Sequence, residues 1–255
     1  MRHRRLASPL LGTVVLVHGL GRTRWSMAPV AWAARRRGYA VVNWGYPSRR
    51  APIAAHAAAL EGALRALADR SPGPLHLVTH SLGGILVRAC LALPAAAAWR
   101  HRVGRVVMLA PPNHGSDVAE RLRRLRAFRR LVGPAGGELG TGADGVPARL
   151  GAPPAGVSVG VIAGARGTSP LFGRWLPRPN DGKVSVASAR LPGMADFRVV
   201  RRGHTFLMLA PEVHTAVFAF LAHGRFDTQP CDASSGDRTA TRATTRGRER
   251  GGRPA

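Results

Sequence analysis

Residues 75–87 read LHLVTHSLGGILV. The apolar stretch up to residue 80 is typical of a buried strand, and residues 85–91 have the character of a helix. Ser81 stands where the strand gives way to the helix, and two glycines follow it closely. A sharp strand-to-helix turn of this kind can lift a serine hydroxyl clear of a sheet and expose it as a nucleophile. Ser81 is therefore the first candidate catalytic residue.

The buried-strand pattern recurs along the chain. Short runs rich in Val, Ile or Leu occupy residues 12–18, 39–44, 75–80, 105–110, 157–164 and 197–200. Helical stretches separate several of them, at 25–37, 53–70 and 85–93, and a last helix over 211–224 opens on a proline and ends on a glycine. This alternation predicts an α/β fold, with a mostly parallel central sheet and helices on both faces.

Two regions depart from this pattern. Residues 117–132 place Val118, Leu122, Leu125, Phe128 and Val132 on one stripe of a single expected helix, with arginines opposite. This helix packs on the surface or forms a small lid, and we take residues 117–150 as the lid region. Residues 226–255 are rich in Arg, Thr and Gly and lack apolar periodicity, so we expect one domain over 1–225 followed by a disordered tail.

The net charge of +25 raises the question of a polyanionic partner. Lys183 is the only lysine, the arginines are scattered, and aromatic residues make up only 5% of the chain. A dedicated nucleic-acid module concentrates its basic residues on one face with aromatics between them. We therefore expect no specific nucleic-acid partner, and at most weak attraction to an anionic membrane surface.

The cysteines and the N-terminal sequence indicate in which cellular compartment the protein is expected. The two cysteines, Cys90 and Cys231, do not suggest a disulfide framework, and no Cys/His cluster has the spacing of a zinc site, so we expect no metal. The basic start leads through a short apolar run directly into His18, without a small-residue cleavage site. The run is far shorter than a membrane span, and we expect a cytoplasmic protein.

A nucleophilic serine needs a base, an acid that orients the base, and backbone N–H donors for the oxyanion. Of the ten histidines, only His204 lies in a loop directly after the last expected strand. Asp181 follows the preceding strand, in an Asp-Gly turn, and is favoured as the acid. Asp196 and Asp144 remain alternatives.

The oxyanion donors are expected at two turns. Leu82 follows the nucleophile, and Leu20 follows the end of the first strand, where the chain reads LVHGLGRT. His18 and Gly19 in that loop, and His80 beside the serine, flank this machinery and are expected to shape the substrate pocket.

These motifs resemble the α/β-hydrolase superfamily, particularly bacterial lipases and esterases with a THSLGG-type turn, and more weakly the GPI inositol-deacylase lipases. The likeness covers about residues 11–224 and rests on LVHGLGRT, LVTHSLGGILVRA, MLAPPNHGS, PNDGKVSV and GHTFLM. It implies an α/β-hydrolase fold and adds weight to a cap over 117–132. Thr79 replaces the glycine common at the start of the turn. No Asp follows His204 closely, so the structural calcium of some related lipases is not expected.

The expected function is cleavage of carboxylic esters by a cofactor-independent serine hydrolase with an apolar, lipid-like acyl group. An acyltransferase, thioesterase or amidase could use the same triad, since a fold does not fix its chemistry. A non-catalytic protein on this scaffold, or a protein that binds membranes or polyanions through its arginines, would be a different class. Salt-dependent binding that Ser81→Ala leaves unchanged would favour a protein that binds membranes or polyanions.

Overall fold

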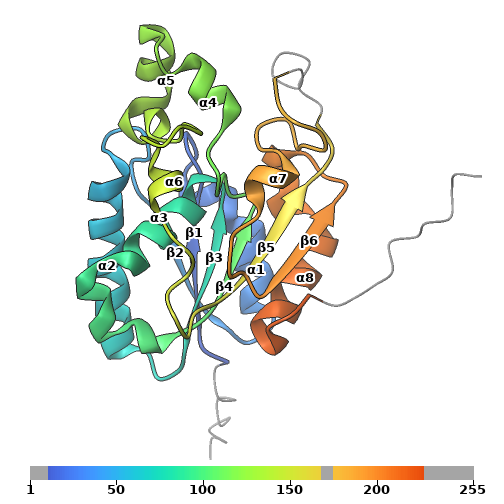
Figure 1. The fold of residues 1–255 in the computed structure, drawn as a ribbon. Coiled ribbons are helices and arrows are strands. Elements are labelled where there is room, and N and C mark those ends of the chain that lie inside the picture. Colours follow the sequence, from blue (N-terminus) through green and yellow to red (C-terminus); the bar gives the residue numbers. More distant parts are fainter. Residues whose placement is uncertain (1–10, 168–174, 227–255) are drawn as a thin grey trace, which may run out of the picture.

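The computed structural model describes residues 11–167 and 175–226. The strands of this part are β1 (Thr13–Val17), β2 (Ala40–Trp44), β3 (Leu75–His80), β4 (Val103–Leu109), β5 (Ser158–Gly164) and β6 (Asp196–Val200). They form one parallel sheet in the order β2-β1-β3-β4-β5-β6. The six strands lie within two residues of the runs expected from the sequence, and their carboxyl ends share one edge (Figure 1).

Helices cover both faces of the sheet. The α-helices are α1 (Ala28–Arg35), α2 (Ile53–Arg70), α3 (Leu82–Ala92), α4 (Asp117–Leu122), α5 (Arg126–Gly137), α6 (Val146–Arg149), α7 (Val186–Ala189) and α8 (Pro211–His223). Shorter 3-10 helices are η1 (Arg24–Met27), η2 (Pro94–Ala98), η3 (Arg100–Arg102) and η4 (His204–Leu209). The helix expected at 53–70 matches α2 at both ends, whereas α3 begins three residues earlier than expected, directly after Ser81.

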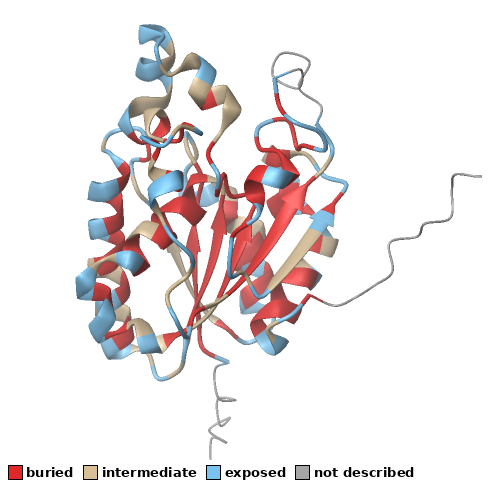
Figure 2. Cartoon of the chain, in the orientation of Figure 1, coloured by how far each residue is buried: buried red, intermediate tan, exposed pale blue. Residues whose placement is uncertain are grey.

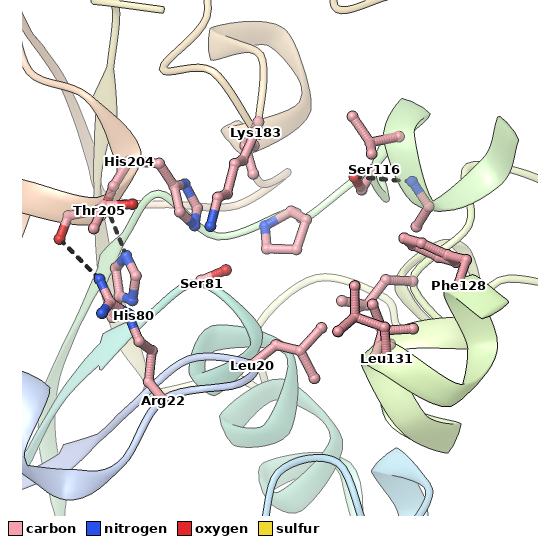
Figure 3. Close-up of a pocket in the computed structure, with 17 residues that line it drawn as sticks. Leu20, Arg22, His80, Ser81, Ser116, Phe128, Leu131, Lys183, His204 and Thr205 are labelled. Atoms are coloured by element: carbon pink, nitrogen blue, oxygen red, sulfur yellow. Dashed lines mark hydrogen bonds between the residues drawn. The ribbon is translucent and has the colours of Figure 1, made fainter. Parts of the chain in front are cut away.

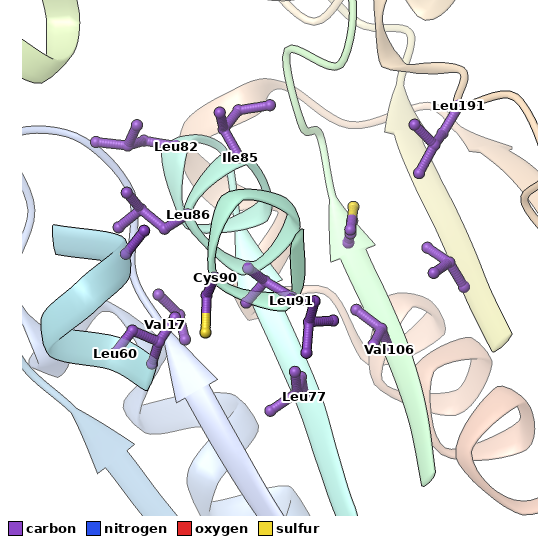
Figure 4. Close-up of a cluster of buried hydrophobic side chains, with 14 of the residues drawn as sticks. Val17, Leu60, Leu77, Leu82, Ile85, Leu86, Cys90, Leu91, Val106 and Leu191 are labelled. Atoms are coloured by element: carbon purple, nitrogen blue, oxygen red, sulfur yellow. The ribbon is translucent and has the colours of Figure 1, made fainter. Parts of the chain in front are cut away.

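Alternate residues of each strand face opposite helical layers, as strand geometry requires. Val15 and Val17 of β1 pack in the cluster that includes α2 and α3, shown in Figure 4. Val14 and Leu16 of the same strand pack in the second cluster, with residues of α1 and α8. The buried side chains follow the sheet and the inner helix surfaces (Figure 2). Both sheet faces are thus closed, and the carboxyl edge is where a site can open.

The expected single helix over 117–132 is wrong. The chain forms two helices, α4 and α5, because Leu125 adopts an extended conformation (φ −79°, ψ 122°) and breaks the helix between them. Leu125 is also 55% exposed, so it does not belong to a buried stripe. The two short helices lie above the carboxyl edge of the sheet (Figure 1), and we call residues 117–145 the cap.

A buried arginine on α3 joins the two chain segments at the base of the cap. The Arg88 guanidinium donates to the backbone oxygens of Asn113 (3.0 Å), Pro147 (3.4 Å) and Gly151 (3.2 Å), and also to that of Leu150. Burial lowers the pKa of Arg88 to about 10. The helix α3, which begins directly after Ser81, is thereby bonded to the segments that lead into and out of the cap.

The C-terminal boundary of the domain lies slightly beyond the expected one. Phe226 is buried, its ring lies 5.0 Å from that of Phe220, and its N–H donates to the Asp196 carboxylate at 2.6 Å. The ordered domain therefore includes this residue, and the tail expected to be disordered falls on 227–255, outside the described residues. In the described ranges, no helix has both the length and the apolar character to cross a membrane.

Candidate active site

Ser81 occupies the turn between β3 and α3 with backbone angles that side chains rarely adopt (φ 53°, ψ −122°). Its N–H donates to the carbonyl of Leu109 on the neighbouring strand at 2.9 Å, and its own carbonyl accepts from the N–H of Gly84 at 2.9 Å. These bonds hold the strained turn in place. The serine side chain is held out beyond the strand end, as the sequence predicts for this turn.

The two glycines that follow Leu82 lie in close contact with their neighbours, Gly83 more severely than Gly84. A Cβ on Gly83 would lie 2.5 Å from the Val17 carbonyl oxygen of β1. A Cβ on Gly84 would lie 3.0 Å from Pro111 and 3.4 Å from the hydroxyl of Thr79. Thr79 is fully buried. Close approach of α3 to β1 therefore depends on Gly83, whereas a side chain at Gly84 would require its neighbours to move slightly.

His204 and Asp181 form a buried hydrogen-bonded pair. The Nδ1 of His204 lies 2.8 Å from Oδ2 of Asp181, and the N–H of His204 donates to the Asp181 carbonyl at 3.0 Å. The other carboxylate oxygen accepts the N–H groups of Lys183 (2.9 Å) and Val184 (2.8 Å). A carboxylate only accepts, so the proton of the imidazole sits on Nδ1 and Nε2 is left as the basic nitrogen.

The two alternative acids lie elsewhere. Asp196 is at the start of β6, at the opposite edge of the sheet, where its carboxylate accepts the N–H groups of Phe197 and Phe226. Asp144 lies in the cap and pairs with Arg123, whose hydrogen bond lowers the pKa of that carboxyl. Among the three aspartates considered, Asp181 is the one bonded to His204.

His80 and His18 flank the serine turn in different ways. The Nε2 of His80 donates to the His204 carbonyl at 3.0 Å, and burial lowers the pKa of His80 well below its usual value. His18 stacks on Tyr46 and is fully buried, with its ring nitrogens bonded to the Gly19 carbonyl (2.9 Å) and the Tyr46 N–H (3.3 Å). Both histidines are thus held neutral, and both support the backbone of the site.

Backbone donors border the serine at the places expected for an oxyanion hole. Leu82 is the first residue of α3, and Leu20 follows the end of β1. Within the described residues, neither backbone N–H has a hydrogen-bond acceptor. A Cβ on Gly19 would lie 3.1 Å from the Ser81 Cβ, so the loop carrying Leu20 passes close to the serine.

A cavity of about 310 Å³ lies between the carboxyl edge of the sheet and the cap. Ser81, His204, His80 and Leu20 line it, whereas His18 and Gly19, which were also expected at the substrate pocket, are not among its lining residues. The cap side of the cavity is apolar and includes the following residues: Val118, Ala119, Phe128, Leu131, Val132 and Leu139. Figure 3 shows the Ser81 side chain facing this space.

Two cationic residues of the cavity were missed by sequence reasoning. Arg22 follows the Leu20 turn, and Lys183 follows the Asp-Gly turn of Asp181. Each is adjacent to a motif already singled out, but a single Arg or Lys in a loop carries no signal of where its side chain points. Among the described residues, no group of three or more His, Cys, Asp or Glu side chains is placed to hold a metal ion.

The fold has many solved counterparts. The mature lipase BlEst2 of Bacillus licheniformis is 22% identical with a TM-score of 0.67, over 86% of this chain and 94% of that one. The metagenomic carboxyl esterase MGS0156 is 22% identical with a TM-score of 0.58, over 79% and 67%. The monoacylglycerol lipase of Paleococcus ferrophilus is 18% identical with a TM-score of 0.53, over 86% and 96%. At these identities the likeness concerns the fold.

No curated protein matches the chain significantly. The sequence profile of the alpha/beta hydrolase family matches residues 14–246, which is most of the chain. The parallel sheet wrapped by helices agrees with that assignment. This chain belongs to the alpha/beta hydrolase family.

Proposed function

We propose that this protein is a serine hydrolase that cleaves carboxylic esters through an acyl-enzyme intermediate. The observation that carries the proposal is the bonded pair of His204 and Asp181 beside a serine in a strained strand-to-helix turn, both opening on one cavity. Along the chain, the serine comes first, the acid second and the histidine last, which is the order that α/β-hydrolases use.

The proposed reaction begins with attack of the Ser81 hydroxyl oxygen on the ester carbonyl. His204 takes the serine proton on Nε2, and Asp181 holds the ring and stabilises the cation through Nδ1. The proton then passes to the leaving alcohol as the ester C–O bond breaks. In the second half, His204 removes a proton from water, the resulting attack releases the acid, and Ser81 regains its proton.

The free N–H groups of Leu20 and Leu82 are the proposed oxyanion donors. Donors of this kind that are aimed at the developing charge each contribute about 2.7–4 kcal/mol to transition-state stabilisation. The closeness of the Gly19 backbone to Ser81 supports this role for the loop. The chemistry needs no cofactor.

The acyl group is proposed to lie against the cap. Phe128 and Val132 of α5, together with Leu139, provide an apolar wall beside Ser81. A cavity of about 310 Å³ is at the lower end of the usual range for small-ligand sites. These features favour an ester with an apolar acyl chain of short to medium length, and hence an esterase or lipase.

A weak attraction to anionic lipid surfaces is a secondary part of the proposal. The outer side of the cap carries a groove bordered by Arg124, Arg126, Arg129 and Arg130, together with Arg123, which pairs with Glu120 and Asp144. Juxtaposed basic residues of this kind add about 1 kcal/mol each near an anionic membrane and are screened by salt. Such contact would hold the protein at a surface that contains lipid esters.

The test is hydrolysis of p-nitrophenyl esters from acetate to palmitate by the wild type, Ser81→Ala and Ser26→Ala. Ser26 lies in η1, outside the cavity, and is a matched control. We expect the activity to be lost in Ser81→Ala alone, with an optimum at short or medium chains. Equal inactivity of all three proteins on every ester would overturn the proposal.

Competition between an alcohol and water for the acyl-enzyme distinguishes acyl transfer from hydrolysis on the same triad. Adding a primary alcohol such as glycerol to the p-nitrophenyl butyrate assay offers the acyl-enzyme a second acceptor. A hydrolase releases mainly butyrate, whereas a transferase yields mainly the new ester. The rates on thioester and anilide analogues of the preferred substrate then show whether the protein also acts as a thioesterase or an amidase.

A further inference from the structure

The charged side chains that line the cavity carry one sign. They are Arg22 and Lys183, and no Asp or Glu of the described residues borders the space. Asp181 lies behind His204, and its side-chain oxygens are already bonded to His204, Lys183 and Val184. The cavity lining therefore carries two positive charges and no carboxylate, although Asp181 attracts Lys183 from outside the lining.

These two cations are poorly satisfied by the protein. Arg22 donates to the carbonyl of Thr205 at 3.4 Å, and the Lys183 ammonium makes no ion pair or hydrogen bond within the described residues. Burial lowers the pKa of Lys183, and repulsion from Arg22 adds to the effect. Two neighbouring cations repel each other, and an anion bound between them would relieve that repulsion.

The polar and apolar parts of the cavity lie on different sides of Ser81. Figure 3 shows Arg22 and Lys183 on the side of His80 and His204, with Phe128 and Leu131 across the cavity. An ester bound with its carbonyl at Ser81 extends its two halves in different directions. Because the apolar half suits the acyl chain, the cationic half is left for the alcohol.

We propose that the site takes esters of an apolar acyl group with an alcohol that carries a phosphate, and that Arg22 and Lys183 bind this phosphate. The inference rests on the proposed ester hydrolysis and names its substrate class. A guanidinium offers a fork of donors to phosphate oxygens, and an ammonium adds a mobile point charge. Two cations match the charge of a phosphate monoester better than that of a single carboxylate.

The covalent steps are unchanged by this choice. Ser81 takes the acyl group, the ester C–O bond breaks, and the proton held by His204 passes to the leaving oxygen. The alcohol departs with its phosphate intact, and water then releases the fatty acid. No phosphorus–oxygen bond is made or broken.

The overall charge of +25 requires a control, since it attracts any anion. Arg35 ends α1, where it is exposed and does not line the cavity. Because α1 returns antiparallel to the strands, its last residue lies far from the carboxyl edge that carries Ser81. Arg35→Gln removes the same charge as Arg22→Gln while leaving the cavity intact.

The experiment compares two substrates that differ only in the phosphate, 1-octanoylglycerol 3-phosphate and 1-octanoylglycerol, below their aggregation concentrations. The measured quantity is the ratio of kcat/KM for the phosphorylated and the neutral ester. Charge-assisted hydrogen bonds contribute about 1.5–3 kcal/mol each, so we expect the ratio to fall about 10- to 100-fold in Arg22→Gln and in Lys183→Gln. Lys183→Arg should restore most of it, and Arg35→Gln should leave it unchanged.

Three kinetic results would overturn the inference. One is a wild-type ratio at or below one. Another is an equal fall of the ratio in Arg35→Gln, which would assign the preference to overall charge. A third substrate, the octanoyl ester of 3-hydroxypropionate, separates phosphate from carboxylate, and a preference for it over the phosphate would also contradict the proposal.

Binding to the inactive Ser81→Ala protein separates this inference from the proposed hydrolysis. Calorimetric titration with hexyl phosphate and with hexanol should show tighter binding of the phosphate, lost when Lys183→Gln is added. If that binding is found but no ester is hydrolysed, the phosphate site stands and the hydrolase proposal falls. If esters are hydrolysed but hexyl phosphate binds no better than hexanol, the phosphate site falls alone.

Discussion

Replacing Asp181 by Asn tests the arrangement of the site more sharply than removing the serine. One carboxylate oxygen accepts two N–H groups, from Lys183 at 2.9 Å and Val184 at 2.8 Å. The amide oxygen of an asparagine must take that position, because its NH₂ group would face two donors there. The NH₂ group is then turned toward Nδ1 of His204, which lies 2.8 Å from the other oxygen.

This forced orientation changes the tautomer of His204. An NH₂ group donates, so Nδ1 must accept and the ring proton moves to Nε2. The nitrogen that should deprotonate Ser81 is then already protonated. Loss of the correct tautomer in serine hydrolases lowers kcat by about 10⁴-fold, equivalent to about 5.5 kcal/mol. The two N–H bonds to the side chain are kept, so the fold should be little affected.

The assay is the steady-state hydrolysis of p-nitrophenyl butyrate by Asp181→Asn, with thermal unfolding measured alongside. The matched controls are Asp196→Asn and Asp144→Asn, which alter the two aspartates that lie away from His204. We expect both controls to retain activity. A loss of less than tenfold in a folded Asp181→Asn protein, or a larger loss in either control, would refute the assignment of the acid.

Three further predictions concern stability. Gly83→Ala should cost about 1–3 kcal/mol and lower the melting temperature and the esterase activity together, because the new Cβ would lie 2.5 Å from a carbonyl oxygen that the sheet holds in place. Arg88→Met should cost about 2–5 kcal/mol in urea unfolding, since it leaves the buried carbonyls of Asn113 and Pro147 without this donor. Burial lowers the pKa of His76 to about 4 from 6.5, so its neutral form stabilises the fold above pH 6.5 and this contribution falls as the pH drops toward 4. Between pH 7 and pH 5, the free energy of unfolding in urea should fall by about 2 kcal/mol less in His76→Gln than in the wild type. An equal fall in both proteins would contradict the lowered pKa of His76.

The four central strands were predictable because most of their residues are buried, so that each appears as a largely apolar run, whereas the edge strands β2 and β6 are only partly buried and were found from shorter apolar runs. The position of Asp181 and His204 followed from chain order, since both lie after strands that end at the same edge. The hydrogen bond between them is a consequence of topology. These are features that local sequence and fold class determine together.

The break at Leu125 was not predictable from periodicity. Residues 123–125 contain neither Gly nor Pro, and the apolar spacing continues through them, so no local signal marks the extended conformation of Leu125. That the side chains of Arg22 and Lys183 line the same cavity could not be predicted for a related reason. They are separated by most of the chain, and side-chain direction in loops depends on contacts that no local pattern encodes.

The bonds of Arg88 have a consequence for how such proteins can diversify. The segment that leaves the core at Asn113 and the segment that re-enters it at Pro147 meet at one guanidinium. An insertion whose two ends lie side by side disturbs the rest of a domain little when its length or composition changes. The cap can therefore be exchanged as a unit, and chimeras joined at these two points should keep the sheet and the Ser81 turn while presenting different residues on the cap side of the cavity.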